Sequence, residues 1–349
     1  MDHDANRDGV PGIVPPVFVN LLVGGRCRLR CPFCRAWRND AEEMPVQGWV
    51  NLFADLAAWV PGRPVAISGG EPLLHPGIEP ILRAAADAGL LVNVSTSGEP
   101  FDDALVHAFP TWPVDGITLS LDGLAATHDR LRGKPGLFRN GLDALDYFKE
   151  VRPGLHTTTA TVINGANLPE LRELTEFLLA KPQIERIYFH AITYFGETRR
   201  WAAPESLPLW PEQSAVLSFL DWLDARRRES DKLVNSPRQI DLWRRYFTDP
   251  LSVFDATGPC PVGRYTLTVK SDGGASLCDF HGPIGNVRDR AVRDLWEGEP
   301  AGALRERMAA CRIPCVYLVN CSFEDVHLDA LPEDARLAYL RAARGKATP

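Results

Sequence analysis

Short apolar runs alternate with segments of helical periodicity along the first two thirds of the chain. Runs typical of buried strands occupy residues 17–23, 64–67, 90–94, 117–121, 156–163 and 187–191. Between them, apolar side chains recur at three- and four-residue intervals, as in residues 47–60, where Trp49 and Phe53 share one face. Strands that alternate with helices predict βαβ units and a parallel sheet.

Several of the predicted helices have recognisable first turns. Helices are expected over residues 76–89, 101–109, 136–151 and 211–229. A further helix follows the fifth strand, with Asn167 as its expected N-cap and with Pro169 and Glu170 in its first turn. Glycines and polar residues fall where the strands end, which is where (βα) barrels carry their functional groups.

The composition is that of a globular protein with an ample core. The chain has 349 residues, of which 45% are hydrophobic, and no apolar run reaches the length of a membrane span. The polar, acidic start lacks the features of a signal peptide, and we expect a disordered lead-in over residues 1–14. A net charge of −7 argues against a general nucleic-acid surface. We therefore expect neither a membrane nor a nucleic acid as partner.

Three of the eight cysteines lie on one loop directly after the first predicted strand. Cys27, Cys31 and Cys34 have the spacing C-x3-C-x2-C. Without a signal peptide, such clustering favours metal ligation in a reducing cytoplasm over disulfides. Three thiolates suit a cubane iron–sulfur cluster whose fourth iron stays open, whereas zinc would need a fourth ligand nearby. The alternative is three unrelated small core residues.

This loop, with the aromatic Phe33 just before Cys34, resembles the signature of the radical S-adenosylmethionine (SAM) enzymes. In that family the open iron of a [4Fe–4S] cluster binds SAM, and reductive cleavage of SAM gives a 5′-deoxyadenosyl radical. The resemblance implies an α/β fold built on an incomplete (βα)6 barrel. It also implies SAM and a [4Fe–4S] cluster as cofactors, with the three loop cysteines as metal ligands and Phe33 beside SAM.

Loops after later strands match further motifs of the family. The GGEP motif, which binds the amino group of SAM, is matched by Gly69, Gly70, Glu71 and Pro72. Two glycines admit a close approach of backbone to ligand, although such a loop is also a common turn. Ser120 and Asp122 point to one side by strand period and suit the ribose hydroxyls of SAM. Their alternative is an ordinary turn with an Asp cap.

Weaker matches complete the expected cofactor site. Arg132 is a candidate donor to the methionine carboxylate of SAM, or else a solvated surface residue. The segment from Thr161 to Asn167 resembles the adenine-binding segment of the family, although Thr161 replaces its usual first glycine. Ile163 and Asn167 are its candidate contacts. Ser95, at the end of the third strand, is a further candidate for polar groups of SAM.

The pattern changes near residue 250. Residues 265–278 predict a β-hairpin with Asp272 and Gly273 at its turn, and short helices are expected over residues 289–297 and 301–311. The spacing of cysteines and glycine there resembles a SPASM or twitch domain, the auxiliary-cluster extension of radical SAM enzymes. The expected organisation is a lead-in over 1–14, a barrel over 15–250, a small β-hairpin plus helix domain over 251–330 and a tail over 331–349.

Five cysteines remain for this second domain, and one auxiliary [4Fe–4S] cluster takes four of them. The family pattern favours as ligands Cys260, Cys278, Cys311 and Cys315. Counting alone does not decide which of Cys311, Cys315 and Cys321 is spare. If Cys321 is spare, it is either a buried structural thiol or a catalytic hydrogen-atom donor, as in radical epimerases.

We expect a radical reaction on a small molecule such as a sugar or aminoglycoside-like natural-product intermediate. The reason is that only a short segment precedes the first strand, with no sign of a peptide-recognition domain. Epimerisation results if a thiol returns hydrogen, and dehydrogenation results if the auxiliary cluster takes an electron. The alternatives are a peptide maturase and, outside enzymes, an iron–sulfur scaffold protein. A flavodoxin or ferredoxin is the expected electron donor, and the cytoplasm is the expected location.

Overall fold

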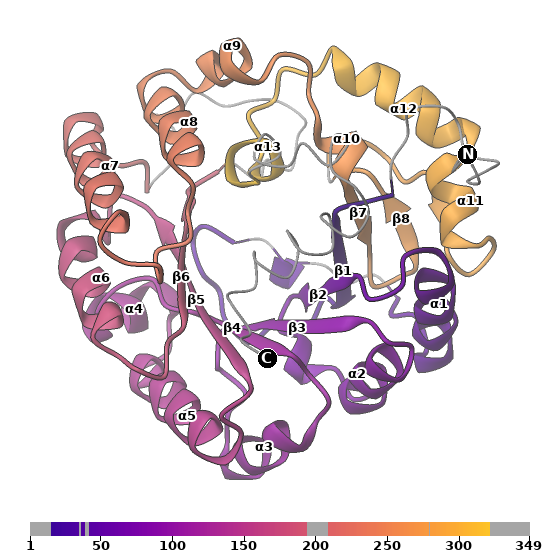
Figure 1. Cartoon of the computed structure of the whole chain (residues 1–349), viewed down its shortest axis with the longest axis horizontal. Helices are drawn as coiled ribbons and strands as arrows, with labels where there is room; N and C mark the ends of the chain where they lie inside the picture. Colours follow the sequence, from indigo (N-terminus) through magenta and orange to yellow (C-terminus); the bar gives the residue numbers. More distant parts are fainter. Residues whose placement is uncertain (1–14, 35, 39–41, 194–208, 279, 322–349) are drawn as a thin grey trace, which may run out of the picture.

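Parallel strands form the wall of an incomplete barrel at the centre of the molecule (Figure 1). The computed structural model describes residues 15–34, 36–38, 42–193, 209–278 and 280–321. The predicted lead-in over 1–14 and tail over 331–349 lie outside these ranges. The barrel strands are β1 (Phe18–Gly24), β2 (Pro64–Gly69), β3 (Leu91–Thr96), β4 (Gly116–Ser120), β5 (His156–Ile163) and β6 (Arg186–Ala191). Each pairs in parallel with the next, which confirms the predicted alternating architecture.

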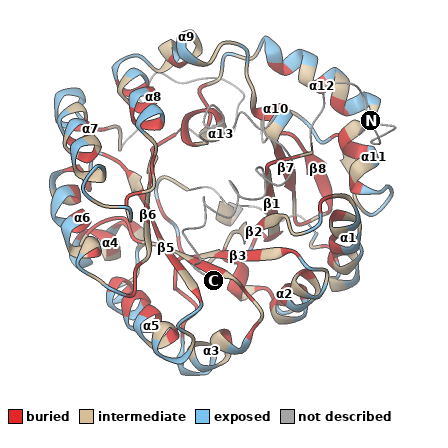
Figure 2. Ribbon diagram, viewed as in Figure 1, coloured by how far each residue is buried: buried red, intermediate tan, exposed pale blue. Residues whose placement is uncertain are grey.

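Helices surround this wall, with their buried faces turned inward and their exposed faces turned outward (Figure 2). Those between the strands are α1 (Val46–Trp59), α2 (Ile78–Asp87), α3 (Asp103–Ala108), α4 (Ala125–Arg132), α5 (Leu137–Val151) and α6 (Leu171–Leu179). In α1 the buried residues Trp49, Phe53 and Leu56 recur at helical spacing, as the sequence predicted. The helical layer and the outward side of the strands share one continuous apolar core.

The structure differs from the sequence prediction at two places in the helices. The first is α4, which the apolar pattern did not predict, because its buried residues are Thr127, His128 and Leu131, of which only the last is apolar. The second is the role of Asn167. Its side chain makes no cap hydrogen bond to the short 3-10 turn Leu168–Glu170 and points instead between β4 and β5.

The strand alternation leaves a hollow, polar interior. In β5 the odd-numbered residues from Thr157 to Ile163 are buried against the helices, and the even-numbered ones, such as Val162, face inward. The inward positions of the other strands include Ser95, Thr118 and Ser120. Small and polar side chains do not fill the interior, so space for ligands remains at the carboxyl ends of the strands.

The C-terminal part continues the same sheet. Its elements are α7 (Gln213–Arg227), α8 (Pro237–Thr248), α9 (Val253–Thr257), α10 (Val262–Tyr265), β7 (Thr266–Val269), β8 (Gly274–Ser276), β9 (Gly285–Asn286), α11 (Val292–Glu297), α12 (Glu299–Ala309) and α13 (Val316–Asn320). β7 pairs in parallel with β1 and antiparallel with β8, and the predicted turn lies between them, where Gly273 has a φ of 85°. The bounds 15–250 and 251–330 stay a prediction.

Side-chain amides cover the outer edge of β6. Asn235 accepts a hydrogen bond from the Phe189 N–H at 2.8 Å and donates one to the Phe189 carbonyl at 3.0 Å. Asn320 makes the same two contacts with Ala191, also at 2.8 and 3.0 Å. Both amides therefore stand in for a neighbouring strand, and the one on Asn320 fixes α13 to the barrel.

Candidate active site

A cavity of about 440 Å³ lies at the carboxyl ends of the barrel strands. It is bordered by the cysteine loop, by the loops after β2 and β3, by inward side chains of β4 to β6, and by α13. The sequence-predicted site residues along it are Cys27, Cys31, Phe33, Cys34, Gly69, Gly70, Ser95, Ser120 and Arg132. The barrel therefore brings together residues as far apart in the chain as Cys27 and Arg132.

Alternation in the cysteine loop turns the thiols inward. Cys31 and Leu29 are buried and pack with Leu137, while Cys27 and Cys34 are half-buried beside them. Burial raises the pKa of the Cys31 thiol to about 11, an effect that the Arg132 guanidinium opposes. Such thiols stay protonated until a metal replaces the proton, which is the usual coupling of metal binding to deprotonation.

Two glycines allow the loop after β2 to pack directly on the cysteine loop. The Gly70 N–H donates to the Gly24 carbonyl at 2.8 Å, and the Glu71 N–H donates to the Arg26 carbonyl at 2.7 Å. A Cβ on Gly70 would lie 2.4 Å from the Arg26 carbonyl oxygen. Gly69 has a φ of 132°, a conformation open to glycine. The Gly-Gly pair therefore sets the distance between the two loops.

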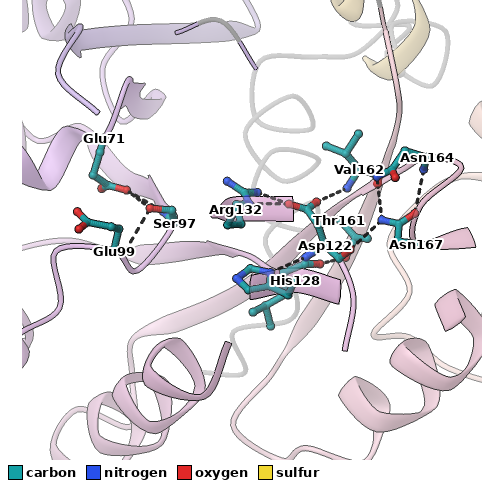
Figure 3. Close-up of polar contacts among 11 residues, drawn as sticks. Glu71, Ser97, Glu99, Asp122, His128, Arg132, Thr161, Val162, Asn164 and Asn167 are labelled. Carbon is teal, nitrogen blue, oxygen red and sulfur yellow. Dashed lines mark hydrogen bonds and ion pairs between the residues drawn. The ribbon is translucent and has the colours of Figure 1, made fainter. Parts of the chain in front are cut away.

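The Glu71 carboxylate points away from the cavity. It is 2% exposed, and it accepts hydrogen bonds from the Thr96 hydroxyl at 2.7 Å and from the N–H and hydroxyl of Ser97 at 2.9 and 2.6 Å (Figure 3). Burial raises its pKa despite these donors. Glu71 therefore joins the loops after β2 and β3, and neither it nor the buried Pro72 lines the cavity, so their predicted contact with SAM stays a prediction.

The Asp122 carboxylate is also engaged within the protein. One oxygen accepts from Arg132 Nε at 2.7 Å, and the other accepts from the Val162 N–H at 2.8 Å (Figure 3). His128 is fully buried behind it, and its Nδ1 accepts from the Asp122 N–H at 3.0 Å. The expectation that Asp122 faces the same side as Ser120 was wrong, because β4 ends at Ser120 and the chain turns there.

The two residues predicted from the segment after β5 also lie outside the cavity. Ile163 is fully buried on the helical side of its strand, and the neighbouring Val162 lines the cavity in its place. The Asn167 side chain donates to the carbonyls of Asp122 and Val162 at 2.9 and 2.8 Å. Asn167 thus joins the ends of β4 and β5. Both side chains support the cavity wall from behind.

The structure adds cavity residues that sequence reasoning missed. His190 lies on β6 opposite Val162 in register, and its ring packs at 4.6 Å from that of Tyr188. Burial lowers the pKa of His190 to about 4, so the imidazole is neutral at pH 7. Thr193 and Asn320 lie on the same side of the cavity. The alternation of β6 was the available signal for His190. Ile187 and Phe189 are the buried positions of this strand, so His190 belongs to the opposite, inward-facing set.

The remaining cysteines divide into four that influence one another and one that stands apart. Burial is the main reason that the pKa of Cys260 is raised to about 12, and the nearby Cys311 and Cys278 contribute to the rise. The pKa of Cys315 is raised by burial and by Cys260 and Cys278. Cys321 has its pKa raised to about 12 by burial alone. This grouping agrees with four ligands of one cluster and a spare thiol at the end of α13.

Both groups of cysteine thiols have the ligand chemistry that cubane clusters require. Within the described ranges, no three Cys, His, Asp or Glu side chains surround a point where a single metal ion would bind. A cubane spreads its thiolate ligands over several irons, and soft thiolates are the ligands it requires. Beside the loop of three cysteines, the open cavity leaves room for a ligand on the fourth iron.

Comparison with known proteins gives the family. Residues 21–178 match the model of the Radical SAM superfamily, and residues 260–322 match that of the SPASM iron–sulfur cluster-binding domain. The chain is 31% identical over 305 residues to the PqqA peptide cyclase of Ruegeria pomeroyi, covering 83% of this chain and 76% of the relative. It belongs to the radical SAM enzymes with a SPASM domain. Its cofactors are accordingly SAM, the radical SAM [4Fe–4S] cluster and an auxiliary iron–sulfur centre.

Two further comparisons describe this enzyme's neighbours. The Fe-coproporphyrin III synthase of Methanosarcina barkeri is 30% identical over 324 residues, which cover 86% of this chain and 79% of the relative. The fold matches that of Streptococcus suis SuiB bound to SAM, with a TM-score of 0.65 at 17% identity over 83% of this chain and 68% of SuiB. SuiB has also been solved with its precursor peptide SuiA, with a TM-score of 0.63 at 18% identity over 88% and 71%.

These relatives correct the expected substrate. The sugar or aminoglycoside-like substrate was inferred from a short segment before β1, and epimerisation or dehydrogenation from a spare thiol or the auxiliary cluster. The similarity to a peptide cyclase overturns this expectation. The hydrogen-atom donor role of Cys321 was tied to that epimerisation and loses its support.

As for membranes, none of the helices in the described ranges is both long enough and apolar enough to cross one.

Proposed function

We propose that this enzyme modifies a peptide by radical chemistry. The observation that carries the proposal is the 31% identity to a PqqA peptide cyclase over 305 residues, because that match covers 83% of the chain. SAM bound at the cavity supplies the 5′-deoxyadenosyl radical, and the protein's own residues position the peptide and keep water out.

The cavity has two walls with different roles in this proposal. One consists of the cysteine loop, the Gly69–Gly70 backbone, Ser95, Ser120 and Arg132, and we assign SAM to it. The other consists of β6 and α13 and carries His190 and Thr193. Hydrogen-bonding side chains suit a peptide, which offers one donor and one acceptor at nearly every residue.

The metal ligands follow from the two groups of thiols. We assign the radical SAM cluster to Cys27, Cys31 and Cys34, and the auxiliary cluster to Cys260, Cys278, Cys311 and Cys315. Phe33 contacts the site from the cysteine loop, where the Arg132 guanidinium lies 5.5 Å from its ring centroid. Thiolate clusters of this kind fit a reducing cytoplasm, and a flavodoxin or ferredoxin is the electron donor that we propose.

A porphyrin substrate is the second candidate, because the Fe-coproporphyrin III synthase is 30% identical over 324 residues. The two candidates differ in the product that the same assay detects. The reconstituted enzyme is incubated without oxygen with SAM and dithionite. One series contains synthetic peptides translated from the short reading frames beside its gene, and the other contains iron coproporphyrin.

Formation of a new bond within the peptide predicts a product lighter by two hydrogen atoms, formed together with 5′-deoxyadenosine. One hydrogen atom would go to the 5′-deoxyadenosyl radical, and the second would leave as a proton with its electron passing to the auxiliary cluster. The matched control is the triple variant Cys27→Ala, Cys31→Ala and Cys34→Ala, which retains the SPASM cysteines and produces neither. Unchanged peptides together with a converted porphyrin would replace the peptide proposal with the second candidate. Failure of the wild type to cleave SAM with either substrate would contradict both.

A further inference from the structure

Three arginines cover the outer side of the cysteine loop. In the segment from Arg26 to Cys31 the side chains alternate: Arg26, Arg28 and Arg30 are exposed, while Leu29 and Cys31 are buried and Cys27 is half-buried. The thiols and the three guanidinium groups therefore lie on opposite sides of one short stretch of backbone. We call these three residues the loop arginines.

The charge of this surface differs from that of the chain as a whole. Among the described residues, ion pairs join Arg26 to Glu43, and both Arg28 and Lys134 to Glu99. The Arg26 and Arg28 side chains are 58% and 67% exposed, whereas the Glu43 and Glu99 side chains are 18% and 6% exposed. In both pairs the carboxylate thus lies beneath the arginine, so the more exposed partner is the positive one, on a chain whose net charge is −7.

We propose that the loop arginines are the docking surface for an acidic electron-carrier protein. Radical SAM chemistry consumes one electron per SAM cleaved, and that electron must reach the centre held beneath this surface. A chain with net negative charge repels an acidic carrier in general, so a local positive patch both attracts it and orients it. The surface fits a flavodoxin or ferredoxin, and Arg26 and Arg28 are its outermost charges.

The step balances as a single-electron transfer. The reduced carrier loses one electron, the [4Fe–4S] centre gains it, and no bond or proton is exchanged in the contact. Small interfaces are sufficient for such transient encounters, because the complex must dissociate after each transfer. A few exposed charges are therefore enough to determine how fast the carrier arrives and how it is oriented.

Arg30 differs from the other two loop arginines and is unsuitable for the test. Its guanidinium donates to the carbonyls of Cys27 and Leu29 at 2.6 and 2.9 Å and lies 4.6 Å from the Trp37 ring centroid. A change there would disturb the loop itself. Arg26 and Arg28 each contact one carboxylate, at 3.4 and 3.6 Å, and these exposed ion pairs contribute little to the stability of the fold.

The test compares two reductants on the double variant Arg26→Gln, Arg28→Gln of the reconstituted enzyme. SAM cleavage to 5′-deoxyadenosine is measured without a peptide, so the result does not depend on the proposed substrate. The reductants are dithionite and a flavodoxin kept reduced by its NADPH-dependent reductase. The matched control is Arg83→Gln, Arg228→Gln, in which two exposed arginines of outer helices, each paired with one carboxylate, are neutralised.

The flavodoxin-driven rate of the test variant is expected to fall about tenfold at low ionic strength, while its dithionite-driven rate stays that of the wild type. Added salt should slow the wild type and leave the variant nearly unchanged. The dissociation constant for oxidised flavodoxin, from titration calorimetry, should rise in parallel. An equal fall with dithionite, an unchanged flavodoxin rate, or an equal fall in the control variant would each overturn the proposal.

Discussion

Arg132 and Asp122 form a buried ion pair at the boundary between the cofactor cavity and the ends of β4 and β5. Arg132 Nε lies 2.7 Å from Asp122 Oδ2, and a second guanidinium nitrogen contacts the same oxygen. Asp122 is fully buried, while the Arg132 side chain is 12% exposed. The pair therefore presents a fixed cation to the cavity and hides the carboxylate that orients it.

Replacing Asp122 by Ala is expected to lower the free energy of unfolding by about 3–5 kcal/mol, because it leaves a buried guanidinium without its partner. Urea unfolding of the reconstituted enzyme measures the change. Glu176→Ala is the control, since Glu176 pairs with Arg226 while its own side chain is 50% exposed, and exposed pairs contribute about 0–1 kcal/mol. Similar losses in the two variants would contradict the structural role of Asp122.

Gly70→Ala is expected to disturb the cysteine loop, because the added Cβ would meet the Arg26 and Gly25 carbonyl oxygens at 2.4 and 2.6 Å. Iron bound after anaerobic reconstitution should fall from about eight atoms per chain toward about four, the number for one remaining cubane. Gly154→Ala is the control, since a Cβ there meets nothing within 4 Å. A full iron content in Gly70→Ala would show that the loop tolerates the displacement.

Single replacements distinguish the ligand cysteines from the spare one. Cys315→Ala should lose about four irons per chain and the spectrum of the auxiliary cluster, because a cubane needs its full set of thiolates. Cys321→Ala should keep both, since the proposed ligand sets of the two clusters do not include Cys321. Iron analysis and electron paramagnetic resonance of the two reduced variants give the answer. Loss of the auxiliary signal in Cys321→Ala would exchange the two assignments.

The stability of the fold should decrease in acid through a buried histidine. Burial lowers the pKa of His128 to about 4, against 6.5 for an exposed histidine. Between these values the unfolded chain binds a proton that the folded chain excludes, so the free energy of unfolding falls as the pH falls from about 6.5 to about 4. The contribution of His128 is about 3 kcal/mol.

His128→Asn tests this, because the Asn side chain retains an acceptor for the Asp122 N–H but does not titrate. Thermal unfolding measured across the same pH range should show a weaker dependence in this variant than in the wild type. His107→Asn, at an exposed position of α3, should behave as the wild type. A pH dependence that is equally steep in all three proteins would refute the role of His128.

The parts of the fold that could be predicted from the sequence depend on local patterns. Alternating apolar runs gave the six barrel strands, and the Gly69–Gly70 pair was recognised because close backbone contact requires residues without a Cβ. The cysteine loop could be identified from spacing alone, since its three cysteines lie close together in the sequence. In each case the residues that determine the structure are neighbours in the sequence.

The parts that could not be predicted depend on contacts between distant segments. Asp122 looked like a cavity residue because strand alternation was extended past Ser120, whereas Arg132 and the Val162 N–H draw its carboxylate aside. Asn167 looked like a helix cap, but its amide donates to the carbonyls of Asp122 and Val162 at the ends of β4 and β5. Nothing in either local sequence indicates which distant donors or acceptors lack partners.

The parallel pairing of β1 with β7 has a consequence for the separation of the two redox centres. β1 leads into Cys27, and β8, the antiparallel neighbour of β7, leads into Cys278. β8 runs antiparallel to β1, so Cys278 follows β8 at the end where β1 begins, whereas Cys27 follows the other end of β1. The two groups of thiols are thus held apart along the length of β1 as well as by two strand spacings, about 10 Å, across the sheet. Electron tunnelling weakens steeply with distance. A hydrogen-bonded sheet keeps the distance between the two groups of thiols more constant under thermal motion than a flexible linker would.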